Sequence, residues 1–448
     1  MDFLIERFKE NLNKSAFIFN NQTYSYNWFL DKIQYFHKII NENKLSKKII
    51  FLNSTISPES IAFLLSSIKN KIIIIPSIVE DIKNNTTNSY LIEICKPNVI
   101  IDFDKEVKTI HNSNIKINHK LYNQLIEENN AGLVLFSSGT TGEKKAVLHN
   151  FELLLNKYRK VRKDHSTFAF MFYDHIGGID TLFYSLSNCS TLLLTQNRTP
   201  KYICSMIEQW KIEVLPTTPS FLNLIILSEE YKNYNLSSLK YITYGTEVMP
   251  IYTLSKLNQI FPNVEVIQKF GATEVGTLGS KSLNSNSQWM KLGGEGFNVR
   301  IVDDKLEIQA KSSMLGYLNA PSPFTEDGWY QTGDLVEEKD GYLRIIGRES
   351  SIINVGGEKV NPIEVESTLK ELDFIEDVLV FGEKNEIVGN IIIANIKLTP
   401  NIPKTEALVR IKEFARENLP KHKRPVKFKF VTEELLNTNF KKDRKSIP

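Results

Sequence analysis

The sequence predicts an α/β protein with a large N-terminal doubly wound, mostly parallel portion, an added antiparallel sheet and a small mobile α+β C-terminal domain. Three observations lead to this fold class. Apolar runs alternate with amphipathic segments from about residue 130, short runs with turns fill 297–347, and a compact helix–strand pattern follows 351. At 448 residues the chain is too long for one hydrophobic core. We therefore expect a large domain over 1–348 and a small one over 349–448.

The large portion begins its regular alternation with a strand at 132–136 and a helix at 151–162, where apolar residues recur three and four positions apart. Strands that alternate with helices are typical of a parallel sheet with right-handed crossovers. The first 130 residues are less regular but contain two apolar runs that indicate buried strands, at 48–53 and 71–77. Further strands are expected at 167–173, 189–195, 212–219, 239–245 and 264–271, with helices at 180–188, 207–210, 220–230 and 251–261.

Beyond residue 297 the alternation shortens. The runs at 297–310 and 340–347 alternate polar and apolar residues between turns, which indicates an antiparallel sheet. The last hundred residues predict a separate α+β unit. Its expected order is helix 362–372, strands 376–382 and 390–398, helix 406–419 and strand 426–431.

Composition excludes several classes of protein. The formal net charge of +3 is too small to require a nucleic-acid partner. No run reaches the ~18 uncharged apolar residues of a membrane span. Three cysteines without paired spacing suggest neither a disulfide framework nor a zinc site, so a reducing, cytoplasmic location is expected.

Loops that follow the predicted strands carry the candidate chemistry. Ligands of open α/β sheets bind where loops leave the carboxyl ends of strands. The loop SSGTTGEKK (137–145) combines hydroxyls, glycines that let backbone N–H groups approach a ligand, and two lysines. That inventory suits a polyphosphate, although it is not a Walker loop and such residues also form ordinary surface turns.

Five short motifs follow one another from residue 137 to residue 445. SSGTTGEKK is followed by FGATE (270–274), YQTGDL (330–335), Gly347-Arg348 with IINVGGEKVNPIEVE, and NFKKDRK (439–445). This series resembles the adenylate-forming superfamily, which includes acyl- and aryl-CoA synthetases, luciferases and peptide-synthetase adenylation domains. The resemblance covers 130–448. It implies two steps: a carboxylate attacks the α-phosphate of ATP, and a thiol then captures the acyl group and releases AMP.

The resemblance also implies a role for each matched residue on the ATP side. The phosphate loop would hold the β- and γ-phosphates through Ser137, Ser138, Gly139, Thr140, Thr141, Gly142 and Lys145. Glu274 would ligate magnesium, and Thr273 would hydrogen-bond the α-phosphate. Asp334 would accept from both ribose hydroxyls, with Arg348 adding donors. Adenine would lie against Gly245, Thr246, Glu247, Phe270 and Gly271.

The terminal motif supplies the expected catalytic lysine, Lys441, which would stabilise negative charge as the carboxylate approaches phosphate. The chain departs from the family here, because Phe440 replaces a glycine and Lys442 makes a one-place slip possible. Ser350 stands where the hinge usually has Asp or Lys. Lys144-Lys145-Ala146 replaces Pro-Lys-Gly after the phosphate loop.

The acid pocket is expected around YDHIGG (173–178). His175 followed by Ile-Gly-Gly resembles the histidine of acyl- and aryl-CoA synthetases, whereas Asp174 resembles the aspartate that pairs with the amine in amino-acid-activating relatives. Alternatively, one of them faces the pocket and the other caps the following helix, for which Asp is well suited. Gly178 and Ala272 would leave room for an acyl or aryl acid of modest size.

The acceptor is expected to be a pantetheine thiol, on CoA or on a carrier protein. Gly356 and Gly357 resemble the Gly-Gly of CoA synthetases that lets the pantetheine arm pass. Residues 401–448 hold 13 Lys or Arg and 6 Asp or Glu, which indicates either a solvated basic face or a surface for CoA phosphates or an acidic carrier. Two other readings stay open: a stand-alone enzyme that loads an amino or hydroxy acid onto a carrier, and a catalytically inactive nucleotide-binding regulator.

Overall fold

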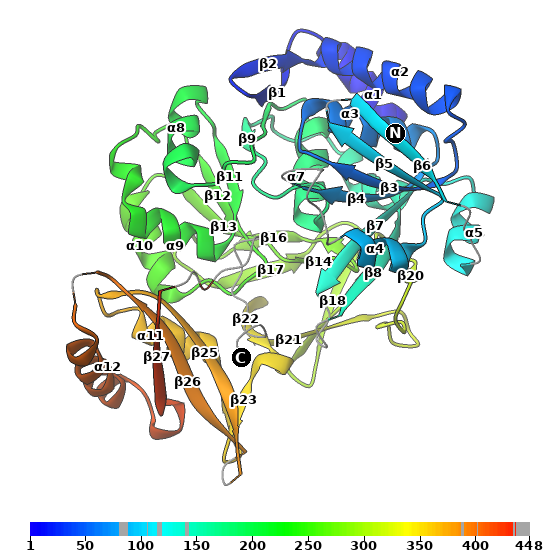
Figure 1. Cartoon of the computed structure of the whole chain (residues 1–448). Helices are drawn as coiled ribbons and strands as arrows, with labels where there is room; N and C mark the ends of the chain where they lie inside the picture. Colours follow the sequence, from blue (N-terminus) through cyan, green and yellow to red (C-terminus); the bar gives the residue numbers. More distant parts are fainter. Residues whose placement is uncertain are drawn as a thin grey trace.

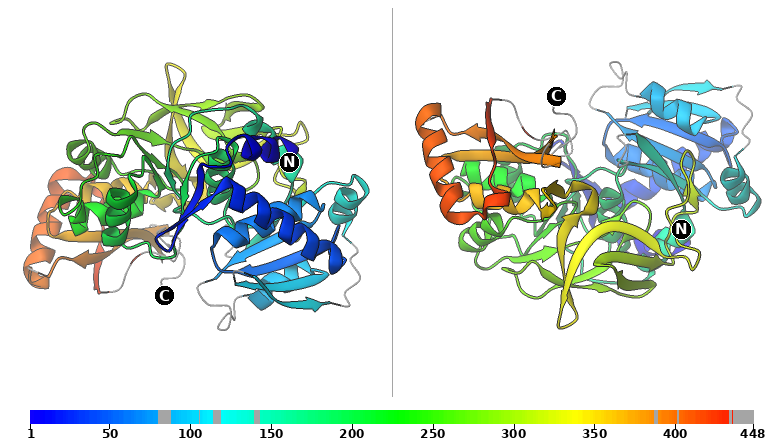
Figure 2. Two further views of the ribbon diagram at one scale, coloured as in Figure 1. Left: turned by 90° about the horizontal axis from the view of Figure 1, so that it is seen from above. Right: turned by 90° about the horizontal axis from the view of Figure 1, so that it is seen from below.

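The computed structural model describes residues 1–79, 88–104, 106–113, 119–138, 143–386, 389–400, 402–432 and 435. Its large portion contains two seven-stranded sheets and one six-stranded sheet, and the C-terminal segment forms a separate small unit. Figures 1 and 2 show this small unit beside the part of the chain that carries β11–β13, away from the first sheet. The predicted fold class is confirmed, including the antiparallel sheet.

The first seven-stranded sheet has the order β20-β8-β7-β4-β3-β5-β6. Its centre is parallel and apolar, whereas β6, β8 and β20 run antiparallel to their neighbours. The strands are β3 (Ile49–Ser54), β4 (Ile73–Ile78), β5 (Val99–Asp104), β6 (Glu106–Asn112), β7 (Gly132–Ser138), β8 (Lys144–Asn150) and β20 (Gly316–Tyr317).

The second seven-stranded sheet has the order β13-β12-β11-β9-β10-β1-β2. The N-terminal hairpin completes it, since β1 lies parallel to β10 with Phe17 opposite Leu192. The remaining pairs are parallel except β1–β2. The strands are β1 (Ser15–Phe19), β2 (Gln22–Ser25), β9 (Thr167–Phe168), β10 (Leu192–Leu193), β11 (Val214–Thr217), β12 (Tyr241–Tyr244) and β13 (Glu265–Gln268).

Helices of the large portion begin at recognisable caps. Thr199 and Thr218 each accept a backbone N–H in the first turn and are followed by proline, while Ser57 forms a reciprocal capping box with Ser60 before α3. These helices are α1 (Asp2–Glu10), α2 (Tyr26–Glu42), α3 (Pro58–Lys69), α4 (Asn88–Cys95), α5 (Lys120–Glu127), α6 (Phe151–Leu155), α7 (Ile176–Ser187), α8 (Pro200–Trp210), α9 (Pro219–Ser228) and α10 (Ile251–Ile260), with 3₁₀ turns η2 (Asn156–Arg159) and η3 (Glu230–Lys232).

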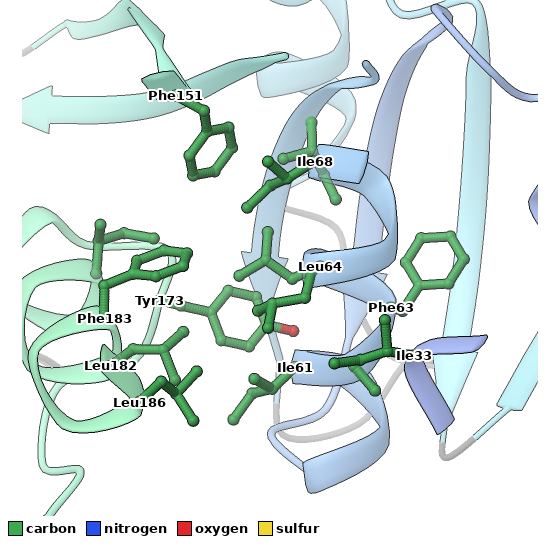
Figure 3. Packing of buried hydrophobic residues seen from close by; sticks show 14 of the residues in the cluster. Ile33, Ile61, Phe63, Leu64, Ile68, Phe151, Tyr173, Leu182, Phe183 and Leu186 are labelled. Carbon is green, nitrogen blue, oxygen red and sulfur yellow. The ribbon is translucent and has the colours of Figure 1, made fainter. Parts of the chain in front are cut away.

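The core that joins the two parallel sheets lies between α3 and α7. Figure 3 shows Ile61 and Leu64 of α3 on the side that faces Leu182 and Leu186 of α7, with Ile68 farther along α3, opposite Phe151. The ring of Tyr173 fills the space between these helices, and its hydroxyl pairs with that of Ser54 at 2.9 Å. The apolar contact therefore fixes the segment just before α7 against the end of β3.

The six-stranded antiparallel sheet has the order β16-β17-β22-β21-β19-β18 and begins earlier than expected, at Gly279. The short hairpin β14–β15 precedes it. The strands are β14 (Gly271–Ala272), β15 (Gly276–Thr277), β16 (Gly279–Ser282), β17 (Trp289–Gly293), β18 (Phe297–Val302), β19 (Lys305–Ala310), β21 (Tyr330–Lys339) and β22 (Tyr342–Arg348).

The C-terminal unit packs two helices on a three-stranded sheet, β25-β26-β27, with the hairpin β23–β24 beside it. A 3₁₀ turn at Glu349–Ser351 connects it to β22, and Asn361 donates to the carbonyl of Ile346 across this connection at 2.8 Å. The proposed boundary at 348/349 stays a prediction. The elements are β23 (Ile353–Val355), β24 (Glu358–Val360), α11 (Pro362–Leu369), β25 (Ile375–Asn385), β26 (Gly389–Leu398), α12 (Lys404–Asn418), η5 (Lys421–Lys423) and β27 (Lys427–Val431).

Several expected elements differ in extent. The helix expected at 151–162 ends at Leu155 and continues as the 3₁₀ turn η2, and the strands expected at 167–173 and 189–195 are two residues each. The strand β8 between the phosphate loop and α6 was not expected at all. Its residues alternate little, because both faces of KAVLHN are buried in the sheet.

Candidate functional site

The predicted phosphate loop is the tip of the antiparallel hairpin β7–β8. Ser137 lies opposite Lys145 and Ser138 opposite Lys144 in the strand register. Residues 139–142, with Gly139, Thr140, Thr141 and Gly142, and the side chain of Ser138 lie outside the described part of the chain. The segment after the loop, which the sequence left unassigned, is the strand β8. The pairing of β7 with β8 places Lys145 opposite Ser137.

Glu274 and Lys145 are connected through a tyrosine that the sequence did not single out. Tyr317 lies on β20, opposite Val147 of β8. Its hydroxyl donates to Oε1 of Glu274 at 2.8 Å, and Lys145 Nζ lies 5.1 Å from the centre of its ring. Glu274 is only 5% exposed. Tyr317 therefore orients the buried carboxylate of Glu274 next to the β7–β8 hairpin, which we call the phosphate hairpin.

The backbone of the FGATE loop is held by His149, which lies at the end of β8. His149 is fully buried, and its Nε2 lies 2.6 Å from the carbonyl oxygen of Thr273. Burial lowers the pKa of His149 to about 4, so the ring is neutral at pH 7 and its Nε2–H donates to Thr273. This contact fixes Thr273 and Glu274 relative to the phosphate hairpin.

Asp334 and Arg348 face each other on paired strands, β21 and β22. Arg348 Nε donates to Oδ1 of Asp334 at 3.3 Å, while the backbone N–H of Asp334 donates to Oγ1 of Thr332 at 3.0 Å. Burial raises the pKa of the Asp334 carboxyl, and the Arg348 guanidinium partly offsets that effect. Glu274 is close enough to act electrostatically on both. The structure thus brings Glu274, Tyr317, Asp334 and Arg348 into one cluster.

The predicted adenine-binding residues lie at adjacent strand ends. Gly245 follows β12, and a Cβ there would lie 2.9 Å from the carbonyl oxygen of Lys269, so the backbones approach too closely for a side chain. Thr246 has a left-handed φ of 73°. Oε2 of Glu247 accepts from the backbone N–H and the hydroxyl of Ser220, at 3.2 and 2.6 Å. Glu247 therefore also fixes the start of α9.

Phe270, Gly271 and Ala272 form the strand end and the first arm of the β14–β15 hairpin. Phe270 and Ala272 are partly buried against the core of the antiparallel sheet. A Cβ at Gly271 would lie 2.9 Å from the carbonyl oxygen of Gly276, so the hairpin requires glycine. The ring of Phe270 thus combines core packing with an exposed part that could contact a base.

The segment before α7 distinguishes Asp174 from His175. Nδ1 of His175 accepts the N–H of Gly177 at 3.1 Å, so His175 is the N-cap of α7. Of the two residues left open as the cap, His175 therefore fills that position, and Oδ2 of Asp174 instead accepts the N–H of Ile78, at the end of β4, at 3.1 Å. Burial raises the pKa of Asp174 to about 6.

The structure explains why glycine occurs at two of the predicted positions, Gly178 and the pair Gly356–Gly357. A Cβ at Gly178 would lie 1.8 Å from the carbonyl oxygen of Phe172, so glycine is required for α7 to pack against the preceding loop. Gly356 and Gly357 have φ of 60° and 93° in the two-residue turn between β23 and β24, and open space surrounds both. This turn demands glycine irrespective of a passing pantetheine arm.

Lys441 lies outside the described residues, as do all of 436–448. Among the described residues, no group of three or more His, Cys, Asp or Glu is arranged to hold a metal ion. None of their helices combines the length and apolar character that a bilayer crossing requires.

Comparison with known proteins decides the family. Residues 44–323 match the family described as AMP-binding enzyme, and residues 364–442 match the AMP-binding enzyme C-terminal domain. The chain belongs to the AMP-binding enzyme family. The resemblance to the adenylate-forming superfamily is thereby confirmed.

Curated relatives of this AMP-binding enzyme differ in acceptor. A D-alanine–D-alanyl carrier protein ligase of Staphylococcus aureus is 25% identical over 447 residues, covering 92% of this chain and 91% of that protein. A 4-coumarate–CoA ligase-like protein of Arabidopsis thaliana is 27% identical over 309 residues, which is 60% of this chain but only 54% of that protein. The chain thus spans about half the length of the latter relative.

Solved structures share the whole fold. The anthranilate CoA ligase AuaEII in complex with anthranoyl-AMP superposes with a TM-score of 0.80 at 19% identity, over 98% of this chain and 95% of that one. ATP-bound MatB from Rhodopseudomonas palustris gives 0.78 at 17% identity, over 97% and 96%. At these identities the likeness establishes the fold of both domains.

Proposed function

We propose that this protein activates a small carboxylic acid with ATP and transfers the acyl group to a pantetheine thiol, on CoA or on a carrier protein. The observation that carries the proposal is the cluster of Glu274, Tyr317, Asp334 and Arg348 beside Lys145. It supports the proposal because it combines a buried carboxylate, an acceptor suited to ribose hydroxyls and two cations, the groups that a nucleoside triphosphate would need.

Within this proposal the ATP side is a set of matched donors and acceptors. Lys145 and the hairpin amides would hold the outer phosphates. Asp334, whose Oδ1 is shared with Arg348, would accept from the ribose hydroxyls. His149 holds the Thr273 carbonyl, which leaves the Thr273 hydroxyl to meet the α-phosphate.

Magnesium fits the donors present at Glu274. A buried carboxylate whose Oε1 accepts from a neutral tyrosine hydroxyl keeps lone pairs for a hard cation. Glu274 would hold the ion with phosphate oxygens of ATP, and the ion would supply charge neutralisation of the phosphates.

The chemistry divides into two displacements. A carboxylate oxygen of the acid forms a bond to the α-phosphorus, and the bond to the bridging oxygen breaks to release pyrophosphate. The sulfur of the thiol then bonds to the acyl carbon, its proton passes to solvent, and AMP leaves. Lys441 would stabilise the first transition state by charge. Rotation near Arg348–Ser350 would present Lys441 and Gly357 to the site alternately.

Pyrophosphate release tests the proposal. The full chain is incubated with magnesium, ATP and hydroxylamine across a panel of fatty, aryl, dicarboxylic, hydroxy and amino acids. We expect release with one chemical class and none without acid. If no acid in the panel causes pyrophosphate release while ATP still binds, the result would favour the inactive nucleotide-binding regulator. The acceptor is then identified by supplying CoA or a phosphopantetheinylated carrier.

A second candidate is favoured by one observation, the full-length similarity to a ligase that uses D-alanine and a carrier protein. A stand-alone enzyme of this kind needs an anion for the substrate amine, and Asp174 offers one carboxylate oxygen beyond that used by the Ile78 N–H. Asp174→Ala would abolish use of an amino acid, whereas it would reduce use of a simple acid only modestly.

A further inference from the structure

Lys269 lies among the predicted substrate-contacting residues but has no role in the chemistry above. It follows β13 and directly precedes Phe270, and its backbone N–H donates to the carbonyl of Tyr244 at 2.7 Å. Its own carbonyl is the close neighbour of Gly245. The residue therefore lies at the carboxyl ends of β12 and β13, between the adenine-binding glycine and Ala272.

Lys269 shares a sheet face that is incompletely covered. On one face of β11–β13 the side chains of Leu215, Ile242 and Val266 are buried against α8, α9 and α10. Alternate residues point to the other face, and there Thr243, Ile267 and Lys269 remain partly exposed. The side chain of Lys269 therefore remains partly exposed to solvent on this face.

The charges around Lys269 do not balance it. The carboxylate that acts most strongly on it, Asp180 of α7, already accepts from Lys157 Nζ at 2.5 Å and from the hydroxyl of Tyr158 at 2.7 Å. Lys157 and Arg162 are further cations, and Glu265 contributes least. Within the part of the chain that the structure describes, Lys269 Nζ has neither a hydrogen bond nor an ion pair.

The charged form of the Lys269 side chain is energetically unfavourable in this environment. Burial and the neighbouring cations lower the pKa of Lys269, with burial the larger cause. Partial loss of water around an ammonium group raises its energy unless an opposite charge or a hydrogen bond replaces that water. Methionine or leucine would fill the same space without that cost, so the cation itself needs an explanation.

We infer that Lys269 selects an acid with a second anionic group, most simply a dicarboxylate. This inference rests on the proposed function and names its substrate class. One carboxylate of the acid faces the α-phosphate, and the second pairs with Lys269 on the open sheet face. Because the lysine side chain also occupies that face, short acids are favoured and long apolar chains are excluded.

Matched pairs of acids test the inference in the full chain. Initial rates of pyrophosphate release give kcat/KM for butanoate and succinate, pentanoate and glutarate, and benzoate and terephthalate. Wild type is compared with Lys269→Met, which keeps the side-chain length and removes the charge, with Lys269→Arg, which keeps the charge, and with Lys281→Met, which changes an exposed lysine on β16.

We expect wild type to prefer the diacid of at least one pair by tenfold or more. Lys269→Met should lower kcat/KM for that diacid about 10- to 100-fold, the range for losing a hydrogen-bonded charge, and change the monoacid less than about threefold. Lys269→Arg should retain the preference, and Lys281→Met should resemble wild type. Equal losses for both members of a pair, or a preference for monoacids, would overturn the inference.

Calorimetry separates this inference from the proposed function. If no acid releases pyrophosphate, diacid binding is measured directly in the presence of AMP. Binding to wild type that is lost in Lys269→Met would support the anion site although the ligase activity had failed. Binding of the diacid to neither protein, or equally to both, would refute the anion site.

Discussion

The two halves of the candidate site differ in how completely their charges are paired. On the ATP side, Glu274 accepts from Tyr317, Asp334 accepts from Arg348, and the Thr273 carbonyl accepts from His149. On the acid side, Lys269 has no partner among the described residues, and Asp174 has a pKa raised by burial. The polar groups on the ATP side are hydrogen-bonded to one another before any ligand binds. The charged groups on the acid side are less completely paired.

This difference follows from what each half must recognise. ATP is the same in every turnover, so its donors and acceptors can be oriented in advance, which lowers the cost of ordering them during the reaction. An acid must be distinguished from competitors, and a buried polar group that only the right substrate satisfies penalises the wrong one. Incomplete pairing therefore indicates where specificity lies.

The largest expected effect tests whether the residues of the ATP side catalyse adenylation without Lys441. Lys441→Ala should reduce adenylation by roughly 10³-fold, because a positive charge at the transition state is lost, while ATP binding changes little. Thioester formation from supplied acyl-adenylate should persist. Pyrophosphate release and single-turnover thioester formation measure the two steps separately.

The neighbouring lysine supplies the matched control for that experiment. Lys442→Ala should leave adenylation within about threefold of wild type. Loss of both half-reactions to the same extent in Lys441→Ala would contradict the division of roles. A large loss only in Lys442→Ala would shift the catalytic assignment by one residue.

A smaller effect tests the positioning of Glu274. Tyr317→Phe removes the hydroxyl that donates to Oε1 and keeps the ring beside Lys145, so we expect KM for magnesium-ATP to rise about 5- to 20-fold with kcat less affected. Added magnesium should recover part of the loss. A merely structural role would instead lower Tm without this dependence on magnesium.

Tyr342→Phe is the control for Tyr317→Phe. Lys291 Nζ lies 4.7 Å from the centre of the Tyr342 ring, so this tyrosine also lies beside a lysine. Within the described residues no carboxylate accepts from its hydroxyl. Its substitution should leave KM unchanged. A similar rise in both variants would remove the special role of Tyr317.

The smallest effect concerns the cost of the Asp174 charge. Its pKa is about 6 in the fold and 3.8 when unperturbed, so the folded protein binds a proton between these values that the unfolded chain releases. The free energy of unfolding therefore falls as pH rises from about 4 to about 6, and the penalty persists above pH 6. Asp174→Asn should be more stable than wild type at pH 7.5, by about 1–2 kcal/mol after allowing for partial exposure.

Chemical denaturation at pH 4 and pH 7.5 measures this difference, which should disappear at the lower pH. Asp164→Asn is the control of opposite sign, since Lys14 lies 2.9 Å from Asp164 and lowers its pKa. Asp164→Asn should be slightly less stable than wild type at pH 7.5. An Asp174→Asn protein no more stable than wild type at either pH would show that the buried charge carries no cost.

The motifs assigned to the ATP side are local, so their residues could be named from the sequence alone. FGATE places Glu274 in the β14–β15 turn and YQTGDL places Asp334 within β21, and the structure brings the two acidic residues near each other. Tyr317 and His149 were missed since their roles depend on β20 pairing with β8 and on β8 reaching the FGATE loop. A lone Tyr in SSMLGYLNAP carries no local signal of such a contact.

The division into two parallel sheets was also beyond local patterns. Alternating strands and helices predict a parallel sheet, but they do not show which strands share it. The expected single series is split, with β7 and β8 in the first sheet and β9 to β13 in the second. Lys269 escaped notice for a similar reason, because only the strand register shows which face its side chain occupies.

The return of the N-terminal hairpin to the second sheet has a consequence for synthesis. Phe17 leaves the ribosome long before Leu192, its partner in the sheet. At translation rates of about 5–20 residues per second, the hairpin waits roughly 10–35 s for its neighbour. During that interval its apolar residues lack their final contacts, so chaperone binding to the nascent chain should concentrate there and end when β10 emerges.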